Sequence, residues 1–134
     1  MEAPATRSRL TSIAPFFIVR DVVPAIDFYR DRLGFEVTFV APEDDPFFAI
    51  VQRDGVRIMI KAIVPEVQPL PNPSRHPWAR WDAFVHVPDP DGLADELTAR
   101  GVTLHEPLAN TKDQLRGFEV RDVDGYVLFF GRPA

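Results

Sequence analysis

The 134-residue chain contains no cysteine. This absence excludes disulfide bonds, thiolate nucleophiles and cysteine-ligated metal sites together, and it is typical of a cytoplasmic protein. No apolar run approaches the length of a membrane span, and no glycine-rich phosphate loop is present. The formal net charge is −5, which argues against a nucleic-acid or anionic-membrane partner, because both favour a basic surface.

Histidine is also scarce, with three residues in the whole chain: His76, His86 and His105. His76 and His105 have no close partner at the i+2 or i+4 spacing of a metal site, so a surface position is expected for both. His86 differs, because strand alternation puts it on the same face as Asp82 and Phe84. There His86 would either donate to a ligand or be a structural histidine at the sheet edge, and the sequence leaves both open.

The chain repeats one pattern of helix and turn signals. Three signals recur at an offset of 67 to 70 residues: Asp21 as Asp89, Gly34 as Gly101, and Asp54-Gly55 as Asp124-Gly125. Such a period indicates two copies of one supersecondary unit. A half of about 65 residues buries too little apolar surface alone, so the halves are expected to pack on each other or on a partner subunit.

Each copy is predicted to run β-α-β-β-β. In the first copy, a strand over 13–20 precedes a helix that begins at the N-cap Asp21 and ends at Gly34. The helix carries one apolar stripe: Val22, Ile26, Tyr29 and Leu33. Three more strands are predicted over 35–41, 47–53 and 56–62, and Asp54-Gly55 forms the last hairpin turn.

The second copy follows a proline-rich connector. Residues 65–77 hold five prolines and are predicted to be extended and stiff. Beyond them we predict a strand over 81–87, a helix from Asp89 to Arg100, and three strands over 102–106, 117–121 and 126–131.

The repeats and the connector set the domain plan. It comprises a flexible N-terminal tail (1–12), a first module (13–64), a connector (65–80) and a second module (81–134). The fold class is α+β, with each four-stranded sheet curled into a half-barrel and its helix on the convex side.

Three segments resemble the vicinal oxygen chelate superfamily: 18–21, 28–35 and 122–126. That superfamily includes glyoxalase I, extradiol dioxygenases, fosfomycin-resistance enzymes and bleomycin-resistance proteins, and the likeness covers about residues 13–132. Its enzymes hold a divalent metal between half-barrels, and the resemblance puts the four ligand positions at Ala14, Met59, Asp82 and Phe129. Alanine and phenylalanine cannot ligate, and a thioether suits Mg²⁺, Mn²⁺ or Fe²⁺ poorly. No metal, no other cofactor and no metal-dependent catalysis are therefore expected.

Residues 81–85 and 129–133 look most like the bleomycin-resistance branch, whose members bind a drug without metal catalysis. The resemblance implies a homodimer that binds a small organic molecule, with antibiotics among the candidates. Strand alternation, the inherited ligand positions and a tryptophan outside the predicted strands indicate the ligand-binding residues: Phe16, Arg57, Met59, Lys61, Trp78, Asp82, Phe84, His86 and Phe129. The same alternation sends Trp81 to the helix side of its sheet.

Two other functional classes remain open from the sequence. One is a lyase or oxidoreductase of the same superfamily, with non-standard metal ligands or metal-free acid–base chemistry by Asp82, His86 and Glu119. The other is a structural or protein-interaction module. This class would be indicated if the structure had a closed core in place of a cleft. The side chains of Phe16, Met59, Phe84 and Phe129 would then fill that core. We expect these four as a group to line a cleft.

Overall fold

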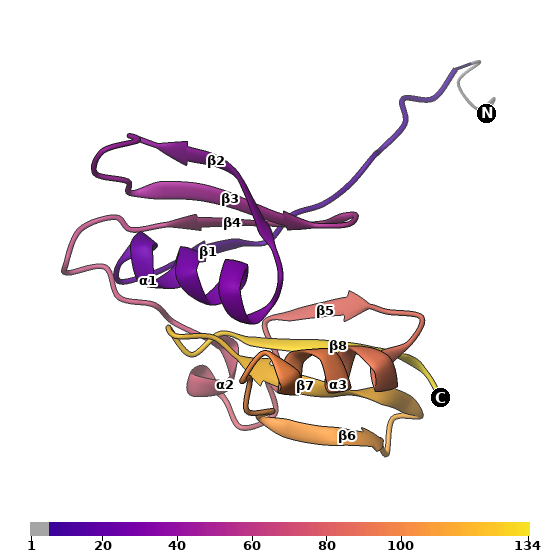
Figure 1. The fold of residues 1–134 in the computed structure, drawn as a ribbon. Coiled ribbons are helices and arrows are strands. Elements are labelled where there is room, and N and C mark those ends of the chain that lie inside the picture. Colours follow the sequence, from indigo (N-terminus) through magenta and orange to yellow (C-terminus); the bar gives the residue numbers. More distant parts are fainter. Residues whose placement is uncertain (1–5) are drawn as a thin grey trace.

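The computed structural model describes residues 6–134, which form two four-stranded sheets, one from each half of the chain (Figure 1). The first sheet has the order β1-β4-β3-β2, from β1 (Phe16–Ile18), β2 (Glu36–Ala41), β3 (Phe48–Arg53) and β4 (Val56–Lys61). The second has the order β5-β8-β7-β6, from β5 (Ala83–His86), β6 (Glu106–Asn110), β7 (Leu115–Arg121) and β8 (Val127–Pro133). In each sheet the first strand pairs parallel with the last, and the other pairs are antiparallel. The predicted α+β fold of two βαβββ modules is confirmed, and neither sheet closes.

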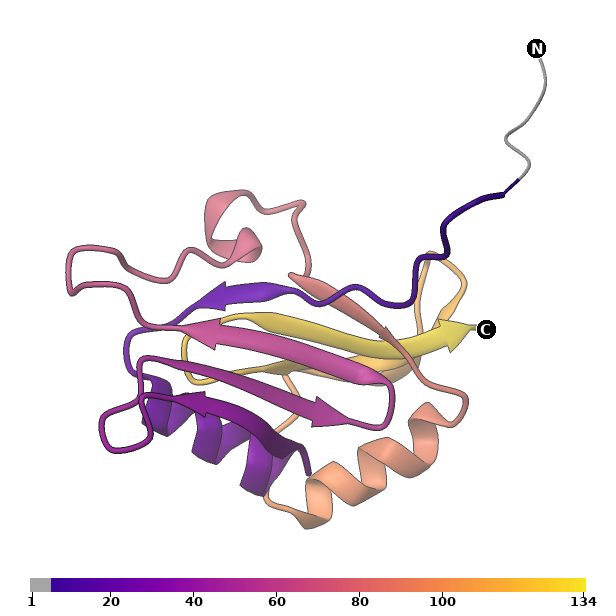
Figure 2. The same cartoon turned by 90° about the horizontal axis from the view of Figure 1, so that it is seen from above.

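One helix covers each sheet on one side. Helix α1 (Val22–Asp27) continues as a π-helical turn, η1 (Phe28–Arg32), and α3 spans Pro90–Ala99. The predicted N-caps are confirmed, because Asp21 accepts the Val23 N–H at 3.1 Å and Asp89 accepts the Gly92 N–H at 3.0 Å. Figure 2 shows both helices on the same side of the molecule.

Two predicted elements are placed differently in the structure. The strand predicted over 102–106 is β6, Glu106–Asn110, because the Val102 N–H donates to the Leu97 oxygen at 3.0 Å and so completes the end of α3. The connector was predicted to be extended throughout, yet it contains a helical turn, α2 (Asn72–Arg75). Pro73 lies in the first turn of α2, where a missing N–H breaks no helical hydrogen bond.

Residues 6–13 extend away from both sheets (Figure 1), and the Pro15 oxygen then accepts the Met59 N–H at 3.0 Å. Residues 6–15 form no helix or strand, and the side chains of Leu10 and Ile13 are exposed. Residues 1–5 of the predicted tail are outside the described part of the chain. Within residues 6–134, no helix has both the length and the apolar character needed to cross a membrane.

A single apolar core joins the two modules within the chain. The Phe17 ring of the first module stacks on Tyr126 of the second at 4.3 Å between centroids. The Tyr29 hydroxyl donates to the Asp122 carboxylate at 2.7 Å. The predicted helix stripe is buried in this core, namely Val22, Ile26, Tyr29 and Leu33. The expectation that the halves pack on each other is therefore confirmed.

Candidate functional site

The first sheet turns an apolar face away from α1. The ladder pairs Phe16 with Met59 and Met59 with Ile50, and the neighbouring residues Phe17 and Ile60 point into the core. The rings of Phe16 and Phe39 both approach the ring of Phe48, at 6.4 and 6.0 Å. Phe16 is 52% exposed and Phe39 is 50% exposed. We call this surface, formed by Phe16, Phe39, Phe48, Ile50 and Met59, the open face.

Two cations lie on the same side of the sheet as the open face. Arg57 and Lys61 alternate with the buried residues Ile58 and Ile60 along β4, so both share the face of Met59. The Arg57 guanidinium donates to the Gln52 amide oxygen at 3.3 Å, and the Lys61 ammonium lies 5.8 Å from the centroid of Phe47. Four predicted site residues are thus brought together here: Phe16, Arg57, Met59 and Lys61.

The corresponding face of the second sheet is filled by aromatic rings. Phe129 pairs with Phe84 across β8 and β5, and their ring centroids lie 5.0 Å apart. Trp81 covers Phe129 at 4.9 Å, and the His86 ring lies 4.5 Å from that of Phe84. We call these four residues, Trp81, Phe84, His86 and Phe129, the aromatic cluster.

Phe129 is only 1% exposed within one chain. Its ring lies over two glycines that face each other across β7 and β8, because a Cβ on Gly117 or Gly131 would come within 2.7 or 2.3 Å of the ring. Trp81 and Phe84 therefore cover most of the Phe129 ring, which also borders a hollow of about 390 Å³ beside Gly117 and Glu119. The role of Phe129 in ligand binding stays a prediction.

The predicted direction of Trp81 was wrong. Trp81 precedes β5, so strand alternation does not govern its side chain. The Trp81 ring packs on Phe84 and Phe129, and the Arg80 guanidinium lies over it, 4.7 Å from the ring centroid. Trp78 is 86% exposed, in keeping with a contact to a ligand or a second chain that stays untested. His76 and His105 are exposed, as expected.

Asp82 at the inherited ligand position is engaged by backbone. Its Oδ1 accepts the Asn72 N–H at 2.7 Å, and its Oδ2 accepts the Val127 N–H at 2.8 Å. The carboxylate thus fastens the connector helix α2 to the start of β8. Together with Ala14, Met59 and Phe129, it makes a donor set that does not fit a divalent metal. Among residues 6–134 no three histidine, aspartate or glutamate side chains gather in a metal-binding arrangement.

The groups considered for acid–base chemistry are dispersed. Asp82 directly precedes β5 and His86 is the last residue of that strand, which separates them by about 13 Å of extended chain. Glu119 pairs with Phe129 in the ladder and is buried, and this burial raises the pKa of its carboxyl group. His86 is exposed. The structure therefore does not assemble a catalytic pair from these three residues.

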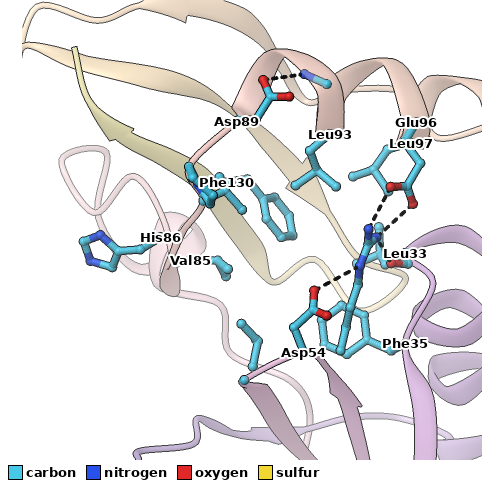
Figure 3. Close-up of a pocket in the computed structure, with 16 residues that line it drawn as sticks. Leu33, Phe35, Asp54, Val85, His86, Asp89, Leu93, Glu96, Leu97 and Phe130 are labelled. Atoms are coloured by element: carbon cyan, nitrogen blue, oxygen red, sulfur yellow. Dashed lines mark hydrogen bonds and ion pairs between the residues drawn. The ribbon is translucent and has the colours of Figure 1, made fainter.

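A hollow with a cavity volume of about 640 Å³ lies between the modules, away from the open face (Figure 3). Of the predicted site residues, only His86 lines it. Sequence reasoning missed this hollow because its walls come from four segments far apart in the chain.

The sequence profile of the glyoxalase/bleomycin resistance protein/dioxygenase superfamily matches residues 9–130. The chain belongs to this superfamily. No protein in the curated comparison matches it. Among solved structures, the bleomycin-binding protein of bleomycin-producing Streptomyces verticillus, complexed with copper(II)-bleomycin, is 26% identical, with a TM-score of 0.69 over 96% of this chain and 100% of that chain.

Two further solved structures share the fold at lower identity. TioX from Micromonospora sp. ML1 is 21% identical, with a TM-score of 0.71 over 92% of this chain and 99% of that chain. TnmS3, an antibiotic-binding protein from Streptomyces sp. CB03234, is 20% identical, with a TM-score of 0.65 over 95% and 100%. These relatives agree with the resemblance to the bleomycin-resistance branch.

Proposed function

We propose that this protein binds a small, largely apolar organic molecule on the open face, without a catalytic metal. The observation that carries the proposal is the half-exposed pair Phe16 and Phe39 on a sheet that does not close. Ligand sites are mostly apolar with a few polar groups, and Arg57 and Lys61 supply those groups here. The antibiotic-binding relatives make antibiotics the first compounds to test. The absence of cysteine supports a cytoplasmic location.

We further propose that a second copy completes the site. The two modules of one chain pack through their helix sides, which leaves the open face uncovered by the rest of residues 6–134. A contiguous apolar patch rimmed by charges is typical of a binding surface. In a homodimer, the second sheet of the partner would oppose the open face and enclose the ligand between two half-barrels.

The dimer is tested by mass. Light scattering at tens of micromolar is expected to give about twice the chain mass of 15.2 kDa. Phe39→Glu would bury an unpaired charge in the interface and is expected to yield monomer. Val123→Glu is the control, because Val123 is equally exposed but lies in the β7–β8 turn. A wild-type monomer, or dissociation by both variants alike, would contradict this arrangement.

Ligand binding is tested by thermal unfolding with bleomycin and a panel of planar aromatic antibiotics. A ligand at a hundredfold excess over its Kd stabilises by about 2.7 kcal/mol, which is measurable as a higher Tm. Phe16→Ala is expected to weaken binding at least tenfold while changing the Tm of the free protein little, because half of that ring is already in water. If no compound raises the Tm, or if Phe16→Ala leaves every affinity unchanged, the proposed function is wrong.

Metal content gives a separate test of the same proposal. Elemental analysis of the dialysed protein is expected to find well below one Zn, Ni, Mn or Fe per chain, because Ala14, Met59 and Phe129 offer no hard donor. One retained equivalent would overturn the metal-free proposal and direct attention to His86 and Asp82 as ligands.

A further inference from the structure

The hollow between the modules has the size and lining of a ligand site (Figure 3). Its volume of about 640 Å³ falls within the roughly 300–1,000 Å³ of typical small-molecule pockets. The first module contributes Leu33, at the end of η1, and Phe35, and the second contributes Val85, Leu93 and Phe130. Figure 3 shows the Phe130 ring and the Leu93 side chain directed into the space. An apolar body would therefore find apolar walls from both modules.

The cation at this hollow is already paired with a carboxylate. The Arg53 guanidinium donates to Glu96 through two hydrogen bonds, at 2.7 and 2.9 Å, and to the Leu33 oxygen at 2.9 Å. Its remaining nitrogen, Nε, lies 4.0 Å from the Asp54 carboxylate. The bidentate pair with Glu96 neutralises the charge of Arg53, so an anionic ligand would compete with Glu96 for this guanidinium.

The carboxylates at the rim are in excess over the cation. Asp54, Asp89 and Glu96 line the hollow against one guanidinium, and Arg100 approaches Glu96 from outside at 3.0 Å. Asp89 uses one oxygen to cap α3, and no basic side chain of residues 6–134 forms an ion pair with it. Asp54 is exposed and only distantly paired. The unmatched charge at the rim is therefore negative.

We propose that this hollow, here called the junction site, binds a compact organic cation: an apolar body carrying a protonated amine. The body lies against Phe35, Leu93 and Phe130, and the ammonium group lies at the rim, where Asp89 accepts from it and Asp54 adds negative charge. Charge complementarity selects the amine, since Glu96 is paired with both Arg53 and Arg100, whereas Asp89 and Asp54 keep charge that no close ion pair matches.

The junction site is separate from the open face. Phe16 and Met59 lie on the side of the first sheet that turns away from α1, whereas the junction site is walled by α3 and by residues of the helix-covered side. His86 is shared with the aromatic cluster but not with the open face. Binding at the two sites can therefore be measured independently, and either proposal can fail alone.

A matched set of three probes tests the selection by charge: 1-naphthylmethylamine, 1-naphthalenemethanol and 1-naphthoate. Titration followed by amide NMR shifts is expected to show the amine bound at least tenfold tighter than the carboxylate, with the shifts centred on Val85, Leu93 and Phe130. Phe16→Ala is expected to leave the affinity for the amine unchanged.

Two variants in α3 test the role of the rim. Asp89→Asn keeps the helix cap, because asparagine caps as well as aspartate, and is expected to weaken amine binding at least threefold. Asp95→Asn removes the same charge from the exposed side of α3 and is expected to have no such effect. Leu93→Trp fills the hollow and is expected to abolish binding of the amine. The proposal is overturned if the amine does not bind at millimolar concentration, if the carboxylate or the alcohol binds as tightly, or if Asp89→Asn and Asp95→Asn behave alike.

Discussion

Phe129→Ala is expected to destabilise the folded chain by about 3–5 kcal/mol, the usual cost of removing a buried phenylalanine ring. The ring is 1% exposed and packs against Trp81 and Phe84. It also occupies the space beside Gly117 and Gly131, which pair across β7 and β8. Without it, neither glycine has a side chain to fill the space, so the cavity would remain. Urea unfolding at 25 °C, analysed by linear extrapolation, measures this loss.

Met59→Ala is the matched comparison, because Met59 holds the equivalent place in the first module, 70 residues earlier. Met59 lies on the open face and is only partly buried, so its truncation is expected to cost clearly less than that of Phe129. Equal costs for the two variants, or a loss below about 1 kcal/mol at Phe129, would show that the aromatic cluster is not packed as described. Such a result would reopen Phe129 as a cleft residue.

The burial of Phe129 illustrates what the sequence can and cannot predict. The helix caps Asp21 and Asp89 and the paired turns were predictable, because each depends on contacts within a few residues. The repeat then placed Met59 and Phe129 on equivalent faces. Whether such a face is open depends on Trp81, a distant contact that no periodicity reports. The one available signal was Gly117 opposite Gly131, since glycine inside a strand often marks a close approach by another group.

The junction site had even less sequence signal. Its walls combine the end of η1, the β3–β4 turn, the end of β5 and α3, which meet only when the two modules pack. Arg53 and Glu96 are 43 residues apart and lie in segments that look like ordinary solvated surface. Likewise, the shift of β6 follows from Val102 completing the last turn of α3, a choice between two backbone partners that hydrophobic pattern does not decide.

The second large effect is a pH dependence at the contact between the modules. Asp122 is buried beneath the β7–β8 turn, where Oδ1 accepts the N–H groups of Asp124 and Tyr126, both at 2.9 Å. Its Oδ2 accepts the Tyr29 hydroxyl from the first module at 2.7 Å. Burial raises the pKa of Asp122 from 3.8 to about 6, because loss of hydration disfavours the charge more than these hydrogen bonds favour it.

The sign of the effect follows from this direction. With its pKa higher in the folded state, Asp122 binds its proton more tightly there, so its contribution is fully present below about pH 4. That contribution is lost as the pH rises through about 6, for a total of about 3 kcal/mol. Paired surface carboxylates such as Asp31 and Asp91, whose pKa values are lowered by arginines, act in the opposite direction. The contribution of Asp122 therefore has to be isolated by a variant.

Asp122→Asn keeps an oxygen for the two backbone N–H groups and turns its amide N–H₂ toward the Tyr29 hydroxyl, which can accept. The variant cannot ionise, so its stability relative to the wild type is expected to rise by about 3 kcal/mol between pH 4 and pH 7. Urea unfolding across that range measures the difference, and Asp44→Asn, in the exposed β2–β3 loop, is the control expected to stay flat. A flat difference for Asp122→Asn, or one that favours the wild type at higher pH, would mean that the carboxylate is better solvated than its burial implies. A difference that favours the wild type at higher pH would mean, in addition, that the three hydrogen bonds favour the charged carboxylate more than burial disfavours it.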